Sequence, residues 1–396
     1  MPENLKFPDG FLWGAATSSH QVEGNTHNDW SEWEKSEKRT NYLKSSGLAD
    51  KYGLDNFISG KACDHYNRYK EDFKLAKELG HNAHRFSIEW SRIEPEEGKF
   101  DEKEIQHYRD VIQSLRDLGL EPFVTLWHWP IPLWLRDMGG WKNEKTADYF
   151  ARYAEAMVKA LPGIRFWVTL NEPEIYAFNS YLRGIWPPQA RNPFTYFKVL
   201  KNLASGHNKA YPLIKAASPE AQVGIAKHNV WFEPADKSLV NRLLVKVADY
   251  LWNDYFLNLI EDFQDFIGLN HYFHNRVNWG FNKNANEKVS DMGWELYPES
   301  IYHSLRDLVK YNKPIYITEN GLADAEDKNR AWFIEETLKH VSRGIEEGID
   351  VRGYFYWSLL DNFEWDKGFW PRFGLVEVDY KTMERKPRRS AFFLKS

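Results

Sequence analysis

Two short strings place a carboxylate where an apolar, strand-like run gives way to a loop. Thr-Leu-Asn-Glu-Pro occupies 169–173 and Ile-Thr-Glu-Asn-Gly occupies 317–321, so the carboxylates are Glu172 and Glu319. In a repeating strand–helix architecture the ends of parallel strands face one shared cleft, so such distant residues can meet there. Paired carboxyl groups on the two sides of a glycosidic bond can act as proton donor and nucleophile. We therefore expect the two glutamates to form a catalytic pair.

Eight short apolar runs alternate with longer segments whose apolar residues recur at helical spacing. The predicted strands are Leu12–Ala16, Ala83–Ile88, Pro122–Trp127, Phe166–Leu170, Val223–Lys227, Phe266–Asn270, Ile315–Thr318 and Gly353–Trp357. The predicted helices include Tyr66–Leu79, Ile105–Leu118, Thr146–Ala160 and Ala331–Glu346. These alternations predict the α/β class and a single (β/α)8 TIM barrel. No Gly/Ser linker or low-complexity tract interrupts them, so we expect one domain over residues 1–396.

Either glutamate string alone is a weak signal, because a glutamate before proline often ends a strand and Asn-Gly is an ordinary turn. Their joint placement after the fourth and seventh predicted strands favours the catalytic interpretation. A doubly wound open sheet is the structural alternative, but it usually has a glycine-rich phosphate turn after its first strand. The string Gly14-Ala-Ala-Thr-Ser does not supply one.

The composition is that of a globular protein with a mixed-sign surface, since 42% of the residues are hydrophobic and 28% are charged. The net charge of −5 gives no broad attraction to phosphate backbones, so we expect no nucleic-acid partner. The basic string Lys386-Pro-Arg-Arg389 is interpreted as a solvated C-terminal turn. The single cysteine, Cys63, excludes an intrachain disulfide and a multi-cysteine metal site.

The N-terminal string Met-Pro-Glu-Asn-Leu-Lys lacks the charged-then-apolar pattern of a signal peptide. No later apolar run reaches the roughly 20 residues that a membrane helix needs. We therefore expect a cytoplasmic location and no membrane partner. His81 and His84 lie three positions apart, but strand alternation turns the two side chains differently, so we assign no metal to them.

Aromatic residues make up 16% of the chain, and many of the 18 tryptophans lie beside polar residues. Sugar rings have apolar faces and a rim of hydroxyl groups, so their binding sites combine aromatic rings with amides and carboxylates. Most of the aromatic residues must simply fill the core, and only those beside strand ends are candidates for binding. The polar and aromatic residues at these ends are Gln21, Arg85, His128, Trp129, Asn171, Glu172, Asn270, Tyr272, Glu319, Trp357, Glu364 and Trp365.

In these strings the chain resembles glycoside hydrolase family 1, the β-glucosidase family, over nearly its whole length. The similarity runs from Phe7-Pro-Asp-Gly-Phe-Leu-Trp-Gly14 to Asp379-Tyr380. Besides the two glutamate strings, it includes Gln21-Val-Glu-Gly24, Arg85-Phe-Ser-Ile-Glu-Trp-Ser-Arg92 and Trp357-Ser-Leu-Leu-Asp-Asn-Phe-Glu-Trp365. Each string alone is moderately specific, and their occurrence in this order is strongly so.

The resemblance implies that Glu172 is the acid/base and Glu319 the nucleophile of a retaining mechanism. It also implies that Arg85 and Tyr272 keep the nucleophile charged, and that Asn171 binds the 2-hydroxyl of the sugar. Such a mechanism needs one ionised and one protonated carboxyl group, which burial and like charge can provide. An arginine in this place can equally be a structural salt-bridge partner, and the two roles do not exclude each other.

The resemblance also implies a set of substrate contacts. It assigns them to Gln21, His128, Trp129, Asn270, Trp294, Trp357, Glu364, Trp365 and Phe373. Trp294 would be the platform for the aglycone, although a buried core tryptophan would give the same pattern, and His128 could be a core histidine. Glu364 favours a neutral sugar, because relatives that cleave 6-phosphoglycosides replace this carboxylate. His84 and His271 stand where the family commonly has another aromatic residue.

We therefore expect a retaining exo-β-glycosidase that cleaves terminal β-D-glucosyl residues and tolerates β-galactosyl or β-fucosyl residues. The substrate would be a β-glycoside or short oligosaccharide, and no cofactor or metal is needed. The compact segments 229–265 and 273–313 predict an open aglycone side. A transglycosylase of the same fold and a catalytically weak sugar-binding barrel stay open as alternatives, and an oxidoreductase barrel is disfavoured. The oligomeric state is left open.

Overall fold

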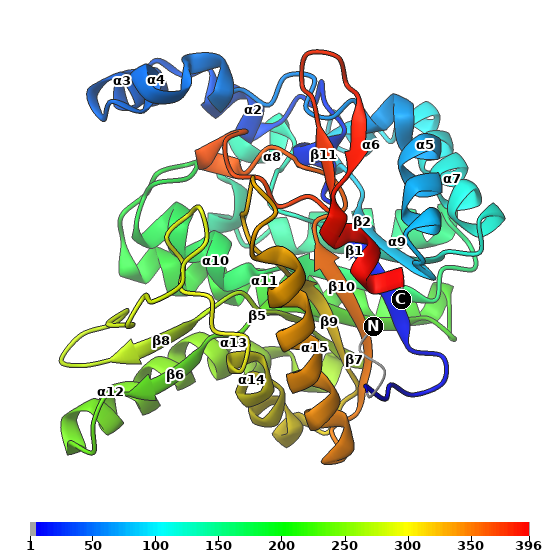
Figure 1. The fold of residues 1–396 in the computed structure, drawn as a ribbon. Coiled ribbons are helices and arrows are strands. Elements are labelled where there is room, and N and C mark those ends of the chain that lie inside the picture. The colour runs from blue at the N-terminus through cyan, green and yellow to red at the C-terminus, as the bar shows by residue number, and fades with distance from the viewer. Residues whose placement is uncertain (1–4, 396) are drawn as a thin grey trace.

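The computed structural model describes residues 5–395, and its centre is a closed barrel of eight parallel strands (Figure 1). The order around the barrel is β1-β10-β9-β7-β5-β4-β3-β2. The barrel strands are β1 Leu12–Ala16, β2 Ala83–Ser87, β3 Glu121–Trp127, β4 Phe166–Asn171, β5 Gln222–His228, β7 Phe266–Asn270, β9 Ile315–Asn320 and β10 Val351–Trp357. This confirms the predicted (β/α)8 barrel.

The predicted strands agree with the observed ones, and their ends differ by at most two residues. The differences at β4 and β9 matter for the site, because pairing continues farther than the apolar runs do. Asn171 still pairs with Ala226 of β5, and Glu319 pairs with Asn270 of β7. Glu319 is therefore part of a barrel strand rather than of the loop that follows it.

Helices cover the outside of the barrel and have the spacing that burial of one face requires. In α7 the buried residues Ile105, Tyr108, Ile112 and Leu115 line one face, and the Asp101 side chain accepts hydrogen bonds at the start of the helix. The longest helices are α5 His65–Glu78, α7 Glu102–Asp117, α9 Thr146–Ala160, α11 Pro193–Ala217 and α15 Arg330–Glu346. The four predicted helices are all present, with shifts of at most three residues at their ends.

Shorter elements decorate the barrel. The shorter α-helices are α1 Ser19–Val22, α2 Asp29–Glu34, α3 Glu37–Ser45, α4 Leu48–Tyr52, α6 Trp90–Ile93, α8 Leu133–Asp137, α10 Pro173–Ala177, α12 Leu239–Asp249, α13 Tyr255–Ile260 and α14 Ser300–Leu308. Outside the barrel, β6 Trp231–Pro234 pairs with β8 His274–Val277, and β11 Val376–Val378 pairs with β12 Arg385–Pro387. Within the described residues, no helix combines the length and the apolar character needed to cross a membrane.

Aromatic rings fill the interior of the barrel. Phe123 stacks on Phe166 at a centroid distance of 4.9 Å. Phe355 and Phe266 also pack against the Phe123 ring, at centroid distances of 5.1 and 5.4 Å. Glycine makes room for them: a Cβ on Gly224 would lie 2.4 Å from the Phe266 carbonyl oxygen and 2.9 Å from its ring. Much of the aromatic content is therefore core, and this packed interior supports the strand ends that carry polar side chains.

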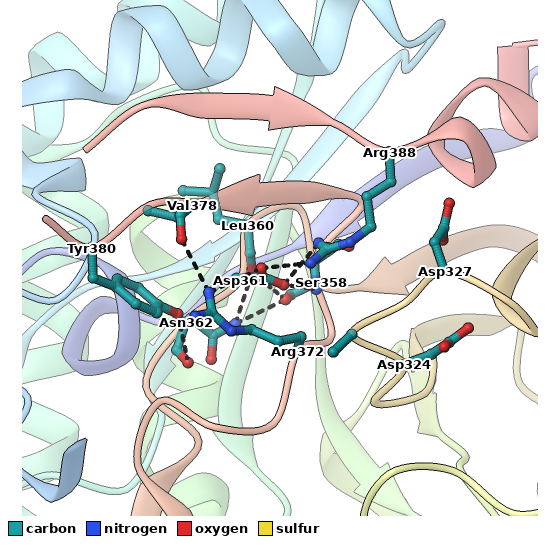
Figure 2. Close-up of polar contacts among 12 residues, drawn as sticks. Asp324, Asp327, Ser358, Leu360, Asp361, Asn362, Arg372, Val378, Tyr380 and Arg388 are labelled. Carbon is teal, nitrogen blue, oxygen red and sulfur yellow. Dashed lines mark hydrogen bonds and ion pairs between the residues drawn. The ribbon is translucent and has the colours of Figure 1, made fainter. Parts of the chain in front are cut away.

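The C-terminal segment is held to the barrel by a buried ion-pair network around Asp361 (Figure 2). The Arg388 guanidinium donates to both Asp361 oxygens at 3.0 and 2.8 Å, and Arg372 Nη1 donates at 3.2 Å. Next to Asp361, the Asn362 amide donates to the Ser358 hydroxyl at 2.8 Å. The network thus fixes the loop between Trp357 and Trp365, in which Glu364 lies.

This network corrects the interpretation of Lys386-Pro-Arg-Arg389 as a solvated turn. Lys386 and Arg389 are exposed, but Arg388 is only 7% exposed. The segment runs on from β12, and the Arg388 backbone N–H donates to the Leu375 carbonyl at 2.9 Å. Arg385, in β12, donates to Asp72, and Arg388, just after the strand, donates to Asp361.

Replacing Asp361 by alanine removes the shared partner of two buried or half-buried arginines. We expect Asp361→Ala to lower the free energy of unfolding by about 3–5 kcal/mol, because a buried charge without its partner is strongly destabilising. Chemical denaturation followed by tryptophan fluorescence measures this loss. The matched control is Asp350→Ala, which removes a half-exposed pair with Arg352 and should cost at most about 1 kcal/mol. Equal losses in the two variants would contradict the account of this network.

Candidate active site

Glu319, at the end of β9, lies between two strong donors. Arg85 Nη1 donates to its Oε1 at 2.6 Å, and the Tyr272 hydroxyl donates to its Oε2 at 2.6 Å. The Glu319 carboxyl group is nearly fully buried, and burial raises its pKa. Arg85 and Tyr272 oppose that rise, since both stabilise the ionised form. This arrangement suits a carboxylate that must keep its charge.

Glu172 lies just beyond the end of β4, at the start of α10. Its backbone has φ of 43°, and its N–H donates to the Ala226 carbonyl at 2.7 Å. Its side chain accepts a hydrogen bond from Asn270 Nδ2 at 2.9 Å and has no cationic partner within the described residues. Burial, and next the negative charge of Glu319, raise the pKa of Glu172 well above its usual range. Of the pair, Glu172 is therefore the carboxyl group that keeps its proton.

Arg85 connects the ends of β4 and β9. Besides Glu319, its guanidinium donates to Asn171 Oδ1 at 2.7 Å, to the Thr318 carbonyl at 3.1 Å and to Thr125 Oγ1 at 3.1 Å. The side chain is 1% exposed, so its charge is neutralised by protein groups rather than by water. The structural and the catalytic interpretation of Arg85 are both consistent with these contacts.

The Asn171 amide has a fixed orientation. Its oxygen accepts from Arg85 and from Asn270 Nδ2 at 3.1 Å, so its nitrogen faces His128 Nε2 at 3.0 Å. Burial, with the charge of Arg85, lowers the pKa of His128 well below its usual range, so the ring is neutral. Because Nε2 accepts from Asn171, the proton lies on Nδ1, which has no partner among the described residues. His128 thus offers one free donor.

The loop after β10 supplies the other polar wall of the site. Gln21 Nε2 donates to the Phe363 carbonyl at 2.9 Å and lies 3.4 Å from Glu364 Oε2. Burial, then the charges of Asp366 and Glu319, raise the pKa of Glu364 to about 8. At neutral pH the Glu364 carboxyl group can therefore donate one hydrogen bond as well as accept others.

Aromatic rings surround these polar groups. Trp365 and Trp357 each lie 5.9 Å from the His128 ring in near-parallel orientation, and Trp129 packs on Trp365 at 4.4 Å. Trp129 also donates its indole N–H to the Asn171 carbonyl at 2.9 Å. These rings therefore hold His128 and Asn171, two of the polar residues of the site, in place.

Trp294 lies beside the nucleophile's hydrogen-bond partner. Its ring centroid is 5.9 Å from that of Tyr272 and 6.1 Å from that of Phe373, and Tyr272 and Phe373 are 6.4 Å apart. With this group, hydrogen bonds, ring contacts and charge interactions connect all fourteen residues that the sequence singled out. The structure thus brings together residues from seven of the eight strand ends.

Sequence reasoning missed several groups in this site. Glu174 and Lys227 form a buried ion pair at 2.8 Å, and the charge of Glu174 contributes to the raised pKa of Glu172. The Thr318 hydroxyl donates to Asn270 Oδ1 at 2.7 Å and so orients the amide that donates to Glu172. Lys227, at the end of the fifth predicted strand, was a charged residue in an apolar run and could have indicated the ion pair. Thr318 had no feature in the sequence that indicated its role.

The two histidines that depart from the family pattern do not disturb the nucleophile. His271 turns away from the site, and its ring contacts the Asn229 carbonyl at 2.9 Å and the Ser300 hydroxyl at 2.6 Å. His84 contacts the Thr17 hydroxyl at 3.2 Å. Within residues 5–395, no cluster of three or more His, Cys, Asp or Glu residues is placed to hold a metal ion.

Comparison with known proteins gives one consistent result. The family model "Glycosyl hydrolase family 1" matches residues 3–262 and 252–396. β-Glucosidase A of Thermotoga maritima is 35% identical, over 98% of this chain and 96% of its own. The solved β-glycosidase from Pyrococcus horikoshii is 41% identical with a TM-score of 0.88, over 99% of this chain and 94% of its own.

A second solved structure, which contains a bound ligand, gives the same result. The β-glucosidase from Thermotoga maritima in complex with glucoimidazole is 33% identical with a TM-score of 0.89, over 98% of this chain and 97% of its own. The match therefore covers both chains almost completely and includes the fold. The chain belongs to glycosyl hydrolase family 1.

Proposed function

We propose that this protein is a retaining exo-β-glycosidase that hydrolyses terminal β-D-glucosyl residues of neutral glycosides. The observation that carries the proposal is the asymmetric pair of buried carboxyl groups. Glu319 has Arg85 and Tyr272 as donors, whereas among residues 5–395 Glu172 has only the Asn270 amide. One carboxyl group is thus prepared to attack and the other to give up a proton. The similar proteins described above, which are β-glucosidases and a β-glycosidase, support the same reaction.

In the first step, a Glu319 oxygen forms a bond to the anomeric carbon. The bond from that carbon to the aglycone oxygen breaks, and Glu172 transfers its proton to the departing oxygen. The product of this step is a covalent glycosyl-enzyme. Arg85 and Tyr272 hold the Glu319 carboxylate in place, so the reacting oxygen needs little reorganisation before attack.

In the second step, Glu172 changes from acid to base, and Glu319 becomes the leaving group. The ester at Glu319 carries no charge, so the repulsion that raised the pKa of Glu172 is gone, and Glu172 stays ionised. Glu172 then accepts a proton from water while the water oxygen attacks the anomeric carbon. The carbon–Glu319 bond breaks, and both carboxyl groups return to their initial states.

The remaining residues would bind the sugar. Asn171 faces the 2-hydroxyl group, and this contact should strengthen as the transition state forms. Gln21, His128 and Glu364 would bind the other hydroxyl groups. The aromatic rings of Trp357 and Trp365 would cover the apolar face of the sugar. Trp129, Asn270 and Phe373 complete the set of contacts with the terminal sugar.

The aglycone side is the less constrained part of the proposal. Trp294 packs against Phe373 and Tyr272, which suits a platform next to the cleaved bond. We propose that β-galactosides and β-fucosides are also accepted. We further propose that residues 1–396 act as one catalytic domain. The cytoplasmic location stays a prediction.

The first experiment tests the assignment of Glu319. We expect Glu319→Ala to lower release of p-nitrophenol from its β-glucoside on the order of 10⁴-fold, a scale typical of removing a catalytic group. Added azide should restore turnover and yield the α-glucosyl azide, because azide enters the cavity left by the carboxylate and inverts the anomeric carbon.

Glu172→Ala is the matched control, because it keeps the nucleophile and removes the acid/base. With an activated aryl glucoside and azide it should give the β-glucosyl azide, since azide then attacks the covalent intermediate. Unchanged activity of Glu319→Ala, or the β-azide from that variant, would overturn the assignment of the nucleophile.

The raised pKa of Glu364 predicts a pH-dependent substrate affinity. Because this pKa is about 8, the wild-type carboxyl group is protonated at pH 7 and loses its proton as the pH rises through 8. The KM for the β-glucoside should therefore rise above pH 8. Glu364→Gln keeps a donor and an acceptor at every pH, so its KM should stay flat, and Glu364→Ala should raise KM about tenfold. A parallel rise of KM in Glu364→Gln would contradict this role.

A further inference from the structure

Helix α12 exposes a row of large apolar side chains to solvent, whereas the solvent face of a surface helix is usually polar. Leu239 is 82% exposed, Leu243 is 63% exposed and Val247 is 47% exposed. These residues are four positions apart, so they lie on one face, and Tyr250 continues that face into the helical turn that follows. The apolar stripe of this helix is therefore not part of the core.

Asn241, on the inward side of α12 with the half-buried Leu244, Val245 and Ala248, helps to attach the helix to the protein. Asn241 is fully buried, and its amide donates to Asp236 Oδ1 at 2.9 Å. Its oxygen accepts from the backbone N–H of Trp279, in the loop after β8, at 2.8 Å. This contact holds the loop next to the helix, and the apolar stripe is left facing outward.

The loop after β8 extends the exposed apolar surface. Trp279 is 73% exposed and Phe281 is 52% exposed. We call Leu239, Leu243, Val247, Tyr250, Trp279 and Phe281 the apolar patch. Such a cluster of large, exposed apolar side chains is typical of an interaction surface. Figure 1 shows α12, β6 and β8 together at the lower left of the view, with α3 and α4 at the upper left.

Cations flank the apolar patch. Lys237, Arg242, Lys246 and Lys283 are exposed, and within residues 5–395 none of them forms an ion pair. Segments 236–251 and 278–289 together hold five Lys and Arg against three Asp and Glu, in a chain whose net charge is −5. The positive charge thus gathers around the patch while the rest of the chain is acidic.

We propose that the apolar patch docks on an anionic lipid surface. An amphipathic helix with leucines on one face, lysine and arginine beside them, and tryptophan nearby has the chemistry of a helix that lies in the headgroup region. A second copy of the chain fits less well, because a two-fold contact would bring the positively charged rim against itself. For such peripheral binding, the proposal replaces the expectation of no membrane partner.

The patch belongs to the catalytic end of the barrel. Only two residues separate β5 from β6, and only three separate β7 from β8, so both outer strands continue from the ends that carry the site. Helix α12 packs on these strands. Docking would therefore hold the enzyme to the lipid by the end of the barrel at which a substrate enters.

Vesicle co-sedimentation of the full chain tests the proposal. The vesicles contain phosphatidylcholine alone or phosphatidylcholine with about one third phosphatidylglycerol. We expect binding to the anionic vesicles and at least about a hundredfold loss of affinity in Leu243→Glu/Trp279→Glu, since two apolar anchors are removed. Arg242→Ala/Lys246→Ala should weaken binding about thirtyfold on anionic vesicles, because each cation near the surface contributes about 1 kcal/mol.

Tyr42→Glu is the matched control, because Tyr42 is a 55% exposed aromatic residue on α3, distant from the patch in Figure 1. It should bind vesicles as the wild type does. All variants should keep wild-type glucoside hydrolysis and melting temperature, which separates this test from that of the catalytic proposal. The proposal is wrong if the wild type binds neither vesicle, if Tyr42→Glu loses binding equally, or if sedimentation reveals a dimer that Leu243→Glu/Trp279→Glu dissociates.

Discussion

The buried guanidinium of Arg85 is the interaction on which the site depends. Two carboxyl groups in one dry cleft repel each other, and burial alone would favour the protonated form of both. Arg85 is 1% exposed and donates to Glu319 but not to Glu172 within the described residues. It therefore makes two chemically identical side chains different. The same cation orients Asn171, so charge control and substrate positioning have a common origin.

The barrel makes this arrangement possible because it brings distant strand ends to one place. Arg85 comes from β2, Asn171 from β4, Asn270 from β7 and Glu319 from β9, and no short segment of the chain contains two of the four strands. The aromatic interior and the helices exclude water from below and from the sides. Electrostatic interactions in such an environment are stronger than in water, so modest differences in hydrogen bonding separate the roles of the two glutamates.

Most of this architecture could be predicted because apolar periodicity and the glutamate strings are local signals. The strand limits of Leu12–Ala16 and Phe266–Asn270 agree with the structure, and Glu172 and Glu319 lie at the ends of β4 and β9 on the same side of the barrel. The misses have a shared cause, which is that a pair of charges is invisible until the fold joins its members. Glu174 with Lys227, and Arg388 with Asp361, are such pairs.

The central claim is that burial and the charge of Glu319 together keep Glu172 protonated, and that loss of this charge lowers the pKa of Glu172. Carbon-13 NMR titration of the Glu172 carboxyl carbon measures its pKa directly, in the free enzyme and after trapping the nucleophile as a slowly hydrolysed fluoroglucosyl ester. The account predicts a fall of about one pKa unit or more on trapping, because the repulsion between the two carboxylates disappears. An unchanged or higher pKa in the trapped enzyme would contradict it.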